Sequence, residues 1–132
     1  MMNDMTWVVV ADAGRARVFQ SPGLTVDLEE VDDFVNVAHS ATTLTEKQEV
    51  EFSASEQKEK ERDKFAKQVA EYLEQARLHQ RFGRLRLIAE SKFLGMILSC
   101  MSAQTHELVF EKVSKDYSAL SVREIQERLQ QS

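Results

Sequence analysis

The chain has 132 residues, of which 42% are hydrophobic and 30% charged, as expected for one soluble globular domain spanning 1–132. Its single cysteine, Cys100, excludes an internal disulfide and suits a reducing compartment. The N-terminus lacks the basic and apolar regions of a secretory signal, and no apolar stretch reaches the roughly 20 residues of a membrane helix. These features predict a cytoplasmic protein without membrane insertion.

The net charge of −5 argues against a general nucleic-acid binder, but the charge is spread unevenly. Residues 27–63 hold twelve acidic and four basic side chains. In residues 77–92 only Glu90 is acidic, and the basic side chains are Arg77, Arg81, Arg84, Arg86 and Lys92. We interpret this basic segment as a candidate phosphate-binding surface, the alternative being a solvated helix end and strand start.

Two strands joined by a tight turn are predicted at the start of the chain. The apolar run 6–12 and the alternating run 15–21 flank a turn that contains Gly14, which is typical of a hairpin. A third strand is predicted over 24–35. Its many acidic residues are typical of an edge strand, because charge there discourages pairing with another chain.

A loop and a long helix follow the hairpin. Residues 36–54 show no hydrophobic period and are predicted to form a loop, with a short strand around 49–52. A helix is predicted over 55–78, because apolar residues recur at helical spacing: Phe65, Val69, Tyr72, Leu73 and Ala76. The first turns of this helix have no apolar face, so we expect them to project into solvent.

Strands and helices alternate in the second half of the chain. A strand is predicted over 84–90 and a helix over 92–101, followed by a strand over 106–113 and a helix over 122–130. The strand over 84–90 is nearly continuous in its apolar residues at its end, which is typical of a central strand.

Both short helices carry a predicted N-cap. Ser91 precedes the helix over 92–101, and Ser121 precedes the last helix. Glu124 stands three residues after Ser121, which completes a capping-box pattern. We therefore expect the last helix to begin at residue 122.

This element order predicts an α/β fold with three helices. The hairpin strands must be antiparallel, whereas the later crossovers must be right-handed and parallel. The simplest sheet that satisfies both conditions is five-stranded and mixed, in the order 3-2-1-4-5, which is a ribonuclease H-like arrangement. It brings the carboxyl ends of strands 1 and 4 together, where α/β proteins tend to build sites.

The role of Asp12 decides between two functions. A two-metal nuclease of this architecture needs carboxylates at strand 1, the first helix and strand 4, and the candidates are Asp12, Glu61, Glu71, Glu90 and Asp116. An aspartate that opens a tight turn instead accepts hydrogen bonds from backbone N–H groups. In that case Gly14 supplies a positive φ, and Arg15 or Arg17 pairs with the carboxylate. The local sequence favours this structural turn.

Other catalytic signals are weaker. His39, His79 and His106 show no metal-ligand spacing, and Cys100 has no neighbouring base in the sequence, which favours a core position. The isolated glycines form no phosphate-binding loop. We therefore predict no metal and no cofactor, and we lean towards a non-enzymatic protein.

Four strings resemble the bacterial host attachment proteins, which are named as proteins required for attachment to host cells. They are "WVVVADAGRARVF", "ERDKFAKQVAEYLEQA", "RLRLIAESKFLGMI" and "VFEKVSKDYSALSVREIQERL". The resemblance covers nearly the whole chain in order. Its most specific parts are the Ala-Asp-x-x-Arg-Ala-Arg turn and the "FLG" helix with "KDYSALS" after it.

That family is similar in turn to the central domain of archaeal and eukaryotic peptide-chain release factors, which implies a connection to ribosomes. In release factors the chemistry depends on a Gly-Gly-Gln loop between the third strand and the long helix. The corresponding interval here contains no glycine. The resemblance therefore does not extend to peptidyl-tRNA hydrolysis.

Together these observations predict a non-enzymatic cytoplasmic binding module of the host attachment family. Its expected partner is the ribosome or RNA, contacted through the basic segment 77–92. One alternative is a metal-dependent nuclease that uses Asp12 and Glu90. Another is a protein–protein adaptor that uses the projecting helix 55–78.

Overall fold

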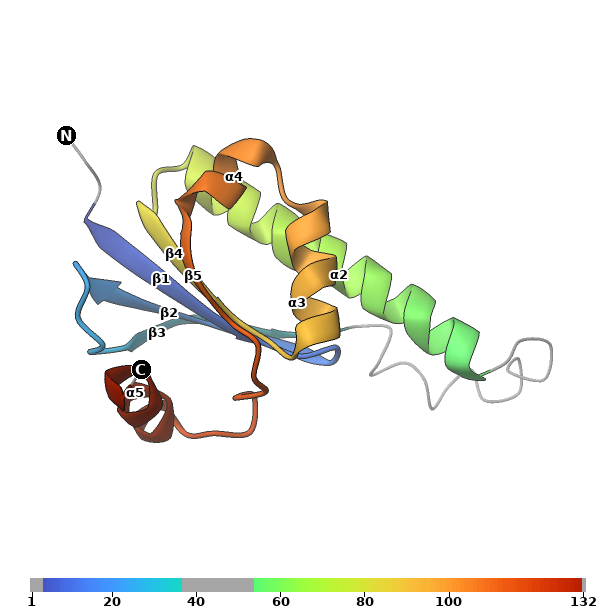
Figure 1. Cartoon of the computed structure of the whole chain (residues 1–132). Helices are drawn as coiled ribbons and strands as arrows, with labels where there is room; N and C mark the ends of the chain where they lie inside the picture. Colours follow the sequence, from blue (N-terminus) through green and yellow to red (C-terminus); the bar gives the residue numbers. More distant parts are fainter. Residues whose placement is uncertain (1–3, 37–53, 132) are drawn as a thin grey trace.

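The protein is described by a computed structural model, which covers residues 4–36 and 54–131 (Figure 1). These residues form a single mixed α/β domain. In chain order its elements are β1 (Met5–Ala11), β2 (Arg15–Pro22), β3 (Glu29–Val35), α2 (Ala54–Leu78), β4 (Arg84–Ile88), α3 (Ser91–Cys100), α4 (Ala103–Leu108), β5 (Val109–Val113) and α5 (Val122–Gln131). The predicted loop over 36–54 and its short strand over 49–52 lie outside the described residues, apart from Asn36 and Ala54.

The five strands form one sheet in the order β3-β2-β1-β4-β5, which confirms the predicted order. β1 pairs antiparallel with β2, and β2 pairs antiparallel with β3. β1 pairs in parallel with β4, and β4 pairs in parallel with β5. A tight turn can join only antiparallel neighbours, so the parallel pairs require the helical crossovers that follow β3 and β4.

The central strand β1 supplies side chains to two separate cores because neighbouring residues of a strand point to opposite faces. Trp7 and Val9 enter the core beneath α2 and α3. Val8 and Val10 enter a smaller core beneath α5. Figure 1 shows α2, α3 and α4 on one side of the sheet and α5 on the other. The sheet is therefore the middle layer of three.

The core beneath α2 and α3 contains the apolar face predicted for the long helix. Phe65 and Leu73 of α2 are fully buried, and Phe93 of α3 stacks on Phe65 with ring centroids 6.0 Å apart. Trp7 stacks on Tyr72 of α2 at 6.0 Å. These contacts fix α2 across the sheet.

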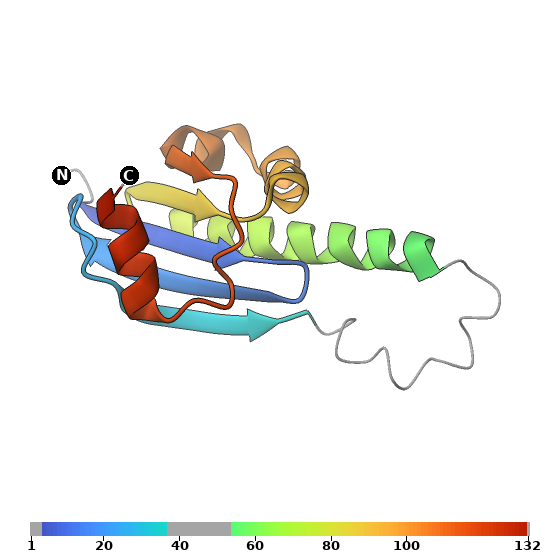
Figure 2. The ribbon, with the colours of Figure 1, turned by 60° about the horizontal axis from the view of Figure 1, so that its bottom comes forward.

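The N-terminal part of α2 extends past the β1–β2 turn, as Figure 2 shows. A helix of 25 residues spans about 37 Å, which is longer than the strands it crosses. The side chains of Glu59, Lys60, Asp63 and Lys64 are exposed in this part. The expected exposure of the first turns is thus confirmed for these four side chains, whereas Glu61 and Arg62 between them are half-buried.

The other face of the sheet is covered by α5. Ile125 and Leu129 are the buried residues of this helix, and they pack on the smaller core. The predicted capping box is present: the Ser121 N–H donates to Glu124 Oε1 at 3.1 Å, and the Glu124 N–H donates to Ser121 Oγ at 3.2 Å. Bonding from the Ser121 backbone N–H lowers the pKa of Glu124, because it favours the charged carboxylate.

The prediction of three helices is wrong, because the described residues contain four. The additional helix, α4, occupies the start of the strand predicted over 106–113, and β5 begins only at Val109. Ser102 caps α4 by accepting a hydrogen bond from the Thr105 N–H at 3.2 Å. Thr105 is itself fully buried, so tertiary contacts hold this short helix in place.

Three other predicted boundaries also differ. The third strand begins at Glu29 rather than at residue 24, because the chain turns after Pro22, where Gly23 has a φ of +57°. The N-cap of α3 is Glu90 rather than Ser91. β4 accordingly ends at Ile88, before the cap.

Candidate functional site

Asp12 closes the β1–β2 turn with its side chain. Its Oδ1 accepts hydrogen bonds from the Gly14 N–H at 2.7 Å and from the Arg15 N–H at 2.8 Å. The Asp12 N–H donates to the Arg15 carbonyl at 2.8 Å. The expected positive φ at Gly14 is wrong, because among the described glycines only Gly23 has one. The carboxylate therefore stabilises the turn without a left-handed glycine.

The arginines after this turn pair elsewhere, which corrects the expectation that one of them pairs with Asp12. Arg15 forms an ion pair with Asp33 of β3, and its Nε lies 2.8 Å from Oδ1. Hydrogen bonding from Arg15 lowers the pKa of Asp33. Arg17 donates through Nη1 to the Leu120 carbonyl at 2.6 Å and to the Ser118 carbonyl at 3.2 Å. Arg17 thereby ties the segment before α5 to β2.

Glu90 is also occupied by backbone groups. Its Oε1 accepts from the Phe93 N–H at 2.7 Å, and its Oε2 accepts from the Lys92 N–H at 3.1 Å. A carboxylate at this position also interacts favourably with the positive end of the α3 dipole. Each of the two main carboxylates of the nuclease hypothesis, Asp12 and Glu90, thus has a local structural role.

The remaining nuclease candidates do not complete a metal site with them. Within residues 4–36 and 54–131, no three histidine, cysteine, aspartate or glutamate side chains are grouped so that they could hold a metal ion. Glu71 lines a groove between α2 and the end of α3. Asp116 accepts a hydrogen bond from the Ser118 N–H at 3.0 Å. The chemistry of shared divalent ions needs carboxylates that converge on one point.

The basic segment 77–92 does not form one continuous surface. Arg77 lies in the last turn of α2, Arg81 follows the helix, and Arg84 begins β4, so these three residues lie at one end of the sheet. Lys92 lies in the first turn of α3, beyond the opposite end of β4, and its Nζ is 2.9 Å from Glu59 Oε1. The basic side chains are therefore divided between the two ends of β4.

Arg86, in the middle of β4, is 8% exposed. Its guanidinium carbon lies 5.0 Å from the centre of the Phe110 ring, and its Nε is 3.4 Å from Glu111 Oε2. The Nε and Nη1 atoms are buried without a hydrogen-bond partner. Burial keeps this arginine from contacting an external phosphate unless the edge of the sheet rearranges.

Arg81 and Arg84 are the accessible basic residues at the start of β4. Arg81 is exposed, and its guanidinium carbon lies 5.0 Å from the centre of the Trp7 ring, a cation–π contact that fixes its position. Arg84 is paired with Asp4 at 3.4 Å, and the Asp4 side chain is 83% exposed. A pair that is this long and open to solvent contributes little stability and can exchange partners.

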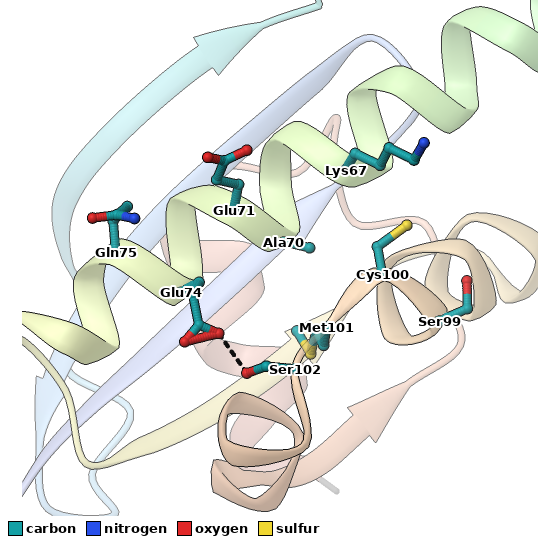
Figure 3. Close-up of a pocket in the computed structure, with 9 residues that line it drawn as sticks. All are labelled: Lys67, Ala70, Glu71, Glu74, Gln75, Ser99, Cys100, Met101 and Ser102. Atoms are coloured by element: carbon teal, nitrogen blue, oxygen red, sulfur yellow. Dashed lines mark hydrogen bonds between the residues drawn. The ribbon is translucent and has the colours of Figure 1, made fainter.

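An open groove of about 620 Å³ lies between α2 and the junction of α3 with α4 (Figure 3). The α2 side of the groove consists of Lys67, Ala70, Glu71, Glu74 and Gln75, and the other side consists of Ser99, Cys100, Met101 and Ser102. Cys100, predicted to be a core residue, is half-buried at this groove. The sequence did not predict the groove, because α4 was not recognised.

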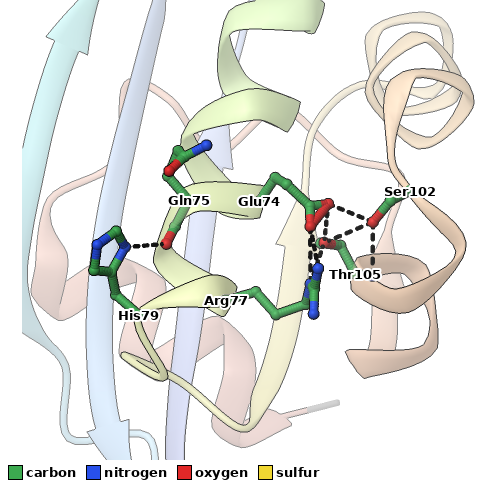
Figure 4. A network of polar contacts seen from close by, with 6 residues as sticks. All are labelled: Glu74, Gln75, Arg77, His79, Ser102 and Thr105. Carbon is green, nitrogen blue, oxygen red and sulfur yellow. Dashed lines mark hydrogen bonds and ion pairs between the residues drawn. The ribbon is translucent and has the colours of Figure 1, made fainter.

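A polar network joins α2 to α4 at one end of this groove (Figure 4). Glu74 accepts hydrogen bonds from Ser102, from Thr105 at 3.1 Å and from Arg77 at 3.0 Å. Hydrogen bonding from Ser102 and Arg77 lowers the pKa of Glu74. The network holds the end of α2 against α4, and it also engages Arg77.

A smaller pocket of about 340 Å³ lies beside Arg81 and is also lined by Tyr72 and His79. The Nδ1 of His79 lies 2.7 Å from the Gln75 carbonyl oxygen (Figure 4). Burial, together with a 3.0 Å hydrogen bond to Asp32, raises the pKa of Tyr72 to about 12. The hydroxyl of Tyr72 therefore stays protonated at neutral pH. Of the other two histidines, His106 is exposed on α4 and His39 lies outside the described residues.

The comparisons with known proteins identify one family. The family model described as "Protein required for attachment to host cells" matches residues 7–129. A search of curated proteins finds no match to the chain. Within the described ranges, none of the helices combines the length and the apolar character that a membrane crossing demands.

Proposed function

The chain belongs to the family of proteins required for attachment to host cells, and on that premise we propose that it acts as a non-enzymatic binding module. Its partner in this proposal is RNA, either free or in the ribosome, contacted at the start of β4. The choice of the ribosome follows from the resemblance of the sequence to the central domain of peptide-chain release factors, and it is part of the proposal. The proposal places the protein in the cytoplasm.

The observation that carries the proposal is the exposed position of Arg81 on the ring of Trp7. Stacking orders a guanidinium without using all of its N–H donors, and the planar fork of these donors matches a phosphate group. Arg84 begins β4, three residues after Arg81, and forms a weak and open pair with Asp4. Arg77 lies nearby, although Glu74 already accepts its hydrogen bonds.

This surface is small, so the expected binding is weak and sensitive to salt. Each neutralised phosphate contributes a slope of about −0.7 to −0.9 in the logarithm of the association constant against the logarithm of salt concentration. Two contacts, from Arg81 and Arg84, would give a total slope of about −1.4 to −1.8. The net charge of −5 adds repulsion over the rest of the molecule.

The experiment is co-sedimentation with ribosomes at low salt, with fluorescence anisotropy on a single-stranded RNA as the second readout. The double variant Arg81→Ala/Arg84→Ala should weaken both interactions and reduce the magnitude of the salt slope by about 1.4 to 1.8. The matched control is Lys115→Ala/Arg123→Ala, which removes the same charge from exposed positions elsewhere.

Loss of binding in the Arg81/Arg84 variant but not in the control supports the proposal. Equal loss in both variants would indicate a general charge effect and would contradict a defined surface. If the wild-type protein associates with neither ribosomes nor RNA at low salt, the RNA proposal is wrong.

A second candidate, a protein–protein adaptor, is favoured by the part of α2 that extends beyond the sheet (Figure 2). Its exposed residues alternate in charge, with Glu59 and Asp63 beside Lys60 and Lys64. Such a surface can pair with a complementary charged helix. The variant Lys60→Glu/Lys64→Glu makes all four positions acidic, and it should abolish capture of a protein partner while leaving RNA binding unchanged.

No observation of the described residues favours the nuclease hypothesis in this way. Asp12 and Glu90 each accept two backbone hydrogen bonds, and these bonds give each side chain a structural role that needs no metal ion. The binding module is therefore the function that the geometry supports best.

A further inference from the structure

β3 forms one edge of the sheet, and β2 occupies its inner side. Among the described elements, none lies along its outer side (Figures 1 and 2). In an edge strand, alternate residues direct their N–H and C=O groups away from the sheet, where no neighbouring strand pairs with them. The outer side of β3 can therefore accept an additional extended segment.

This edge is strongly acidic. Five carboxylates lie within seven residues, all of them exposed and without any basic residue among them: Asp27, Glu29, Glu30, Asp32 and Asp33. Among the ion pairs of the described residues, β3 has only the pair between Asp33 and Arg15. Within residues 4–36 and 54–131, the other four of these carboxylates have no ion-pair partner, so the edge keeps a large negative charge there.

The register places acidic side chains on both faces of β3. Asp32 lies opposite Val18, on the face where the Tyr72 hydroxyl donates to it. Asp33 lies opposite Arg17, on the face covered by α5. A segment added to this edge can therefore meet a carboxylate on either face, and adjacent basic residues in that segment would point to both.

The same charge argues against a second copy of this chain as the occupant. Two β3 edges brought together would place acidic residues opposite acidic residues, which is destabilising. RNA is disfavoured at this edge for the same reason. A basic protein segment is the occupant whose charge is complementary and whose backbone can complete the hydrogen-bonding ladder.

We propose that the β3 edge binds an extended, lysine- and arginine-rich segment of a partner protein by strand addition. β3 has seven residues, so the bound segment is about 23 Å long. Backbone hydrogen bonds supply register and affinity, and carboxylates at Glu29, Glu30 and Asp32 select for basic side chains. This surface is distinct from Arg81 and Arg84, which lie at the start of β4.

The probe is a synthetic seven-residue peptide with the sequence Val-Lys-Arg-Val-Lys-Arg-Val. Its binding to the full chain is measured by fluorescence anisotropy, and its location by chemical-shift changes of backbone amides. Wild-type protein should bind it, and the shifts should concentrate in β3 and β2. A glutamate version of the peptide should not bind.

Two changes separate strand addition from general attraction. The variant Glu29→Gln/Glu30→Gln should weaken the peptide about fivefold, whereas the matched control Glu107→Gln/Glu127→Gln should change the affinity less than about twofold. Two further peptides carry N-methyl groups on alternate residues, one on the odd-numbered and one on the even-numbered residues. Each keeps its charge but loses the backbone N–H donors on one side of the strand. The peptide whose methyl groups replace the N–H donors directed at β3 should bind about tenfold more weakly than the unmodified peptide.

Equal binding of both N-methylated peptides and the unmodified peptide would overturn strand addition, because attraction of charge alone would then suffice. Shifts centred on the groove between α2 and α3, or equal weakening by the control variant, would also contradict the proposal. The variant Arg81→Ala/Arg84→Ala should leave the peptide affinity unchanged, so this test fails or succeeds independently of the RNA proposal.

Discussion

The two faces of the sheet are stabilised by different means. The face beneath α2 and α3 has a broad core with stacked aromatic rings, including Phe65 on Phe93 and Trp7 on Phe82. The face beneath α5 is covered by one ten-residue helix with two buried side chains, Ile125 and Leu129. Burial of apolar area is the main favourable term in folding, so the first face carries the larger share of stability.

Directional polar contacts compensate for the small apolar area of the α5 face. Arg17 of β2 donates to two carbonyl groups in the segment before α5. Gln126 of α5 accepts a hydrogen bond from the Leu28 N–H at 2.9 Å. The comparison indicates that α5 is a unit that can open locally while the α2–α3 face stays folded, because few contacts must break.

The largest expected effect tests this comparison directly with two fully buried aliphatic residues, Leu73 of α2 and Ile125 of α5. Leu73→Ala should lower the free energy of unfolding by about 3 kcal/mol, because it opens a cavity in the main core. Ile125→Ala should mainly lower the hydrogen-exchange protection of α5. Chemical denaturation and amide exchange measure the two effects. An equal loss of protection across all strands in both variants would show that the faces are not separable.

A smaller effect is expected from removing the polar tie to α5. Arg17→Met keeps most of the aliphatic stem but loses the bonds to the Ser118 and Leu120 carbonyls, which should cost about 1–2 kcal/mol. The loss should appear as faster amide exchange in residues 117–131. Arg123→Met is the control, because that side chain is 88% exposed. If both substitutions have the same effect, Arg17 is not the tie.

Weakening the turn at Asp12 should lower the stability of both faces equally, because the β1–β2 hairpin that this turn closes supplies side chains to both cores. Asp12→Ala should lower stability by about 1 kcal/mol, whereas Asp12→Asn should retain much of the hydrogen bonding. Thermal unfolding with and without Mg²⁺ or Mn²⁺ is the measurement. A metal-dependent rise in melting temperature that disappears in Asp12→Asn would restore the nuclease hypothesis.

The smallest expected effect is a pH dependence confined to α5. The pKa of Glu124 is lowered in the folded state below the ordinary value of a glutamate, so its stabilisation of the helix start is present above that ordinary value. It is lost as the pH falls through the lower folded pKa. Protection factors of α5 amides, followed from about pH 6 to about pH 3, should fall more than those of β1. In Glu124→Gln this additional fall should be absent.

Several features of the site follow from local sequence alone. The turn role of Asp12 depends on groups two and three residues away, and the Ser121–Glu124 capping box depends on groups three residues apart. Hydrogen bonds at such short separations form wherever the backbone takes the local conformation. These interactions could therefore be predicted before the fold was known.

The partners of the arginines could not be predicted in this way. Arg15 pairs with Asp33, eighteen residues away, and Arg17 donates to Leu120, more than one hundred residues away. Arg86 was predicted to belong to an accessible basic segment, yet it is buried beneath Phe110. Such contacts depend on which strands become neighbours and on the register between them.

The sequence by itself determined the strand order and the buried face of α2, because hydrophobic periodicity and the handedness of crossovers leave few arrangements. It did not determine α4, whose six residues are too short to show a helical period and are held by buried Thr105 and by the contact of Ser102 with Glu74. The groove between α2 and α3–α4 likewise required the tertiary structure. Its two sides are separated by more than twenty residues in the chain, and only packing on a common sheet brings them together.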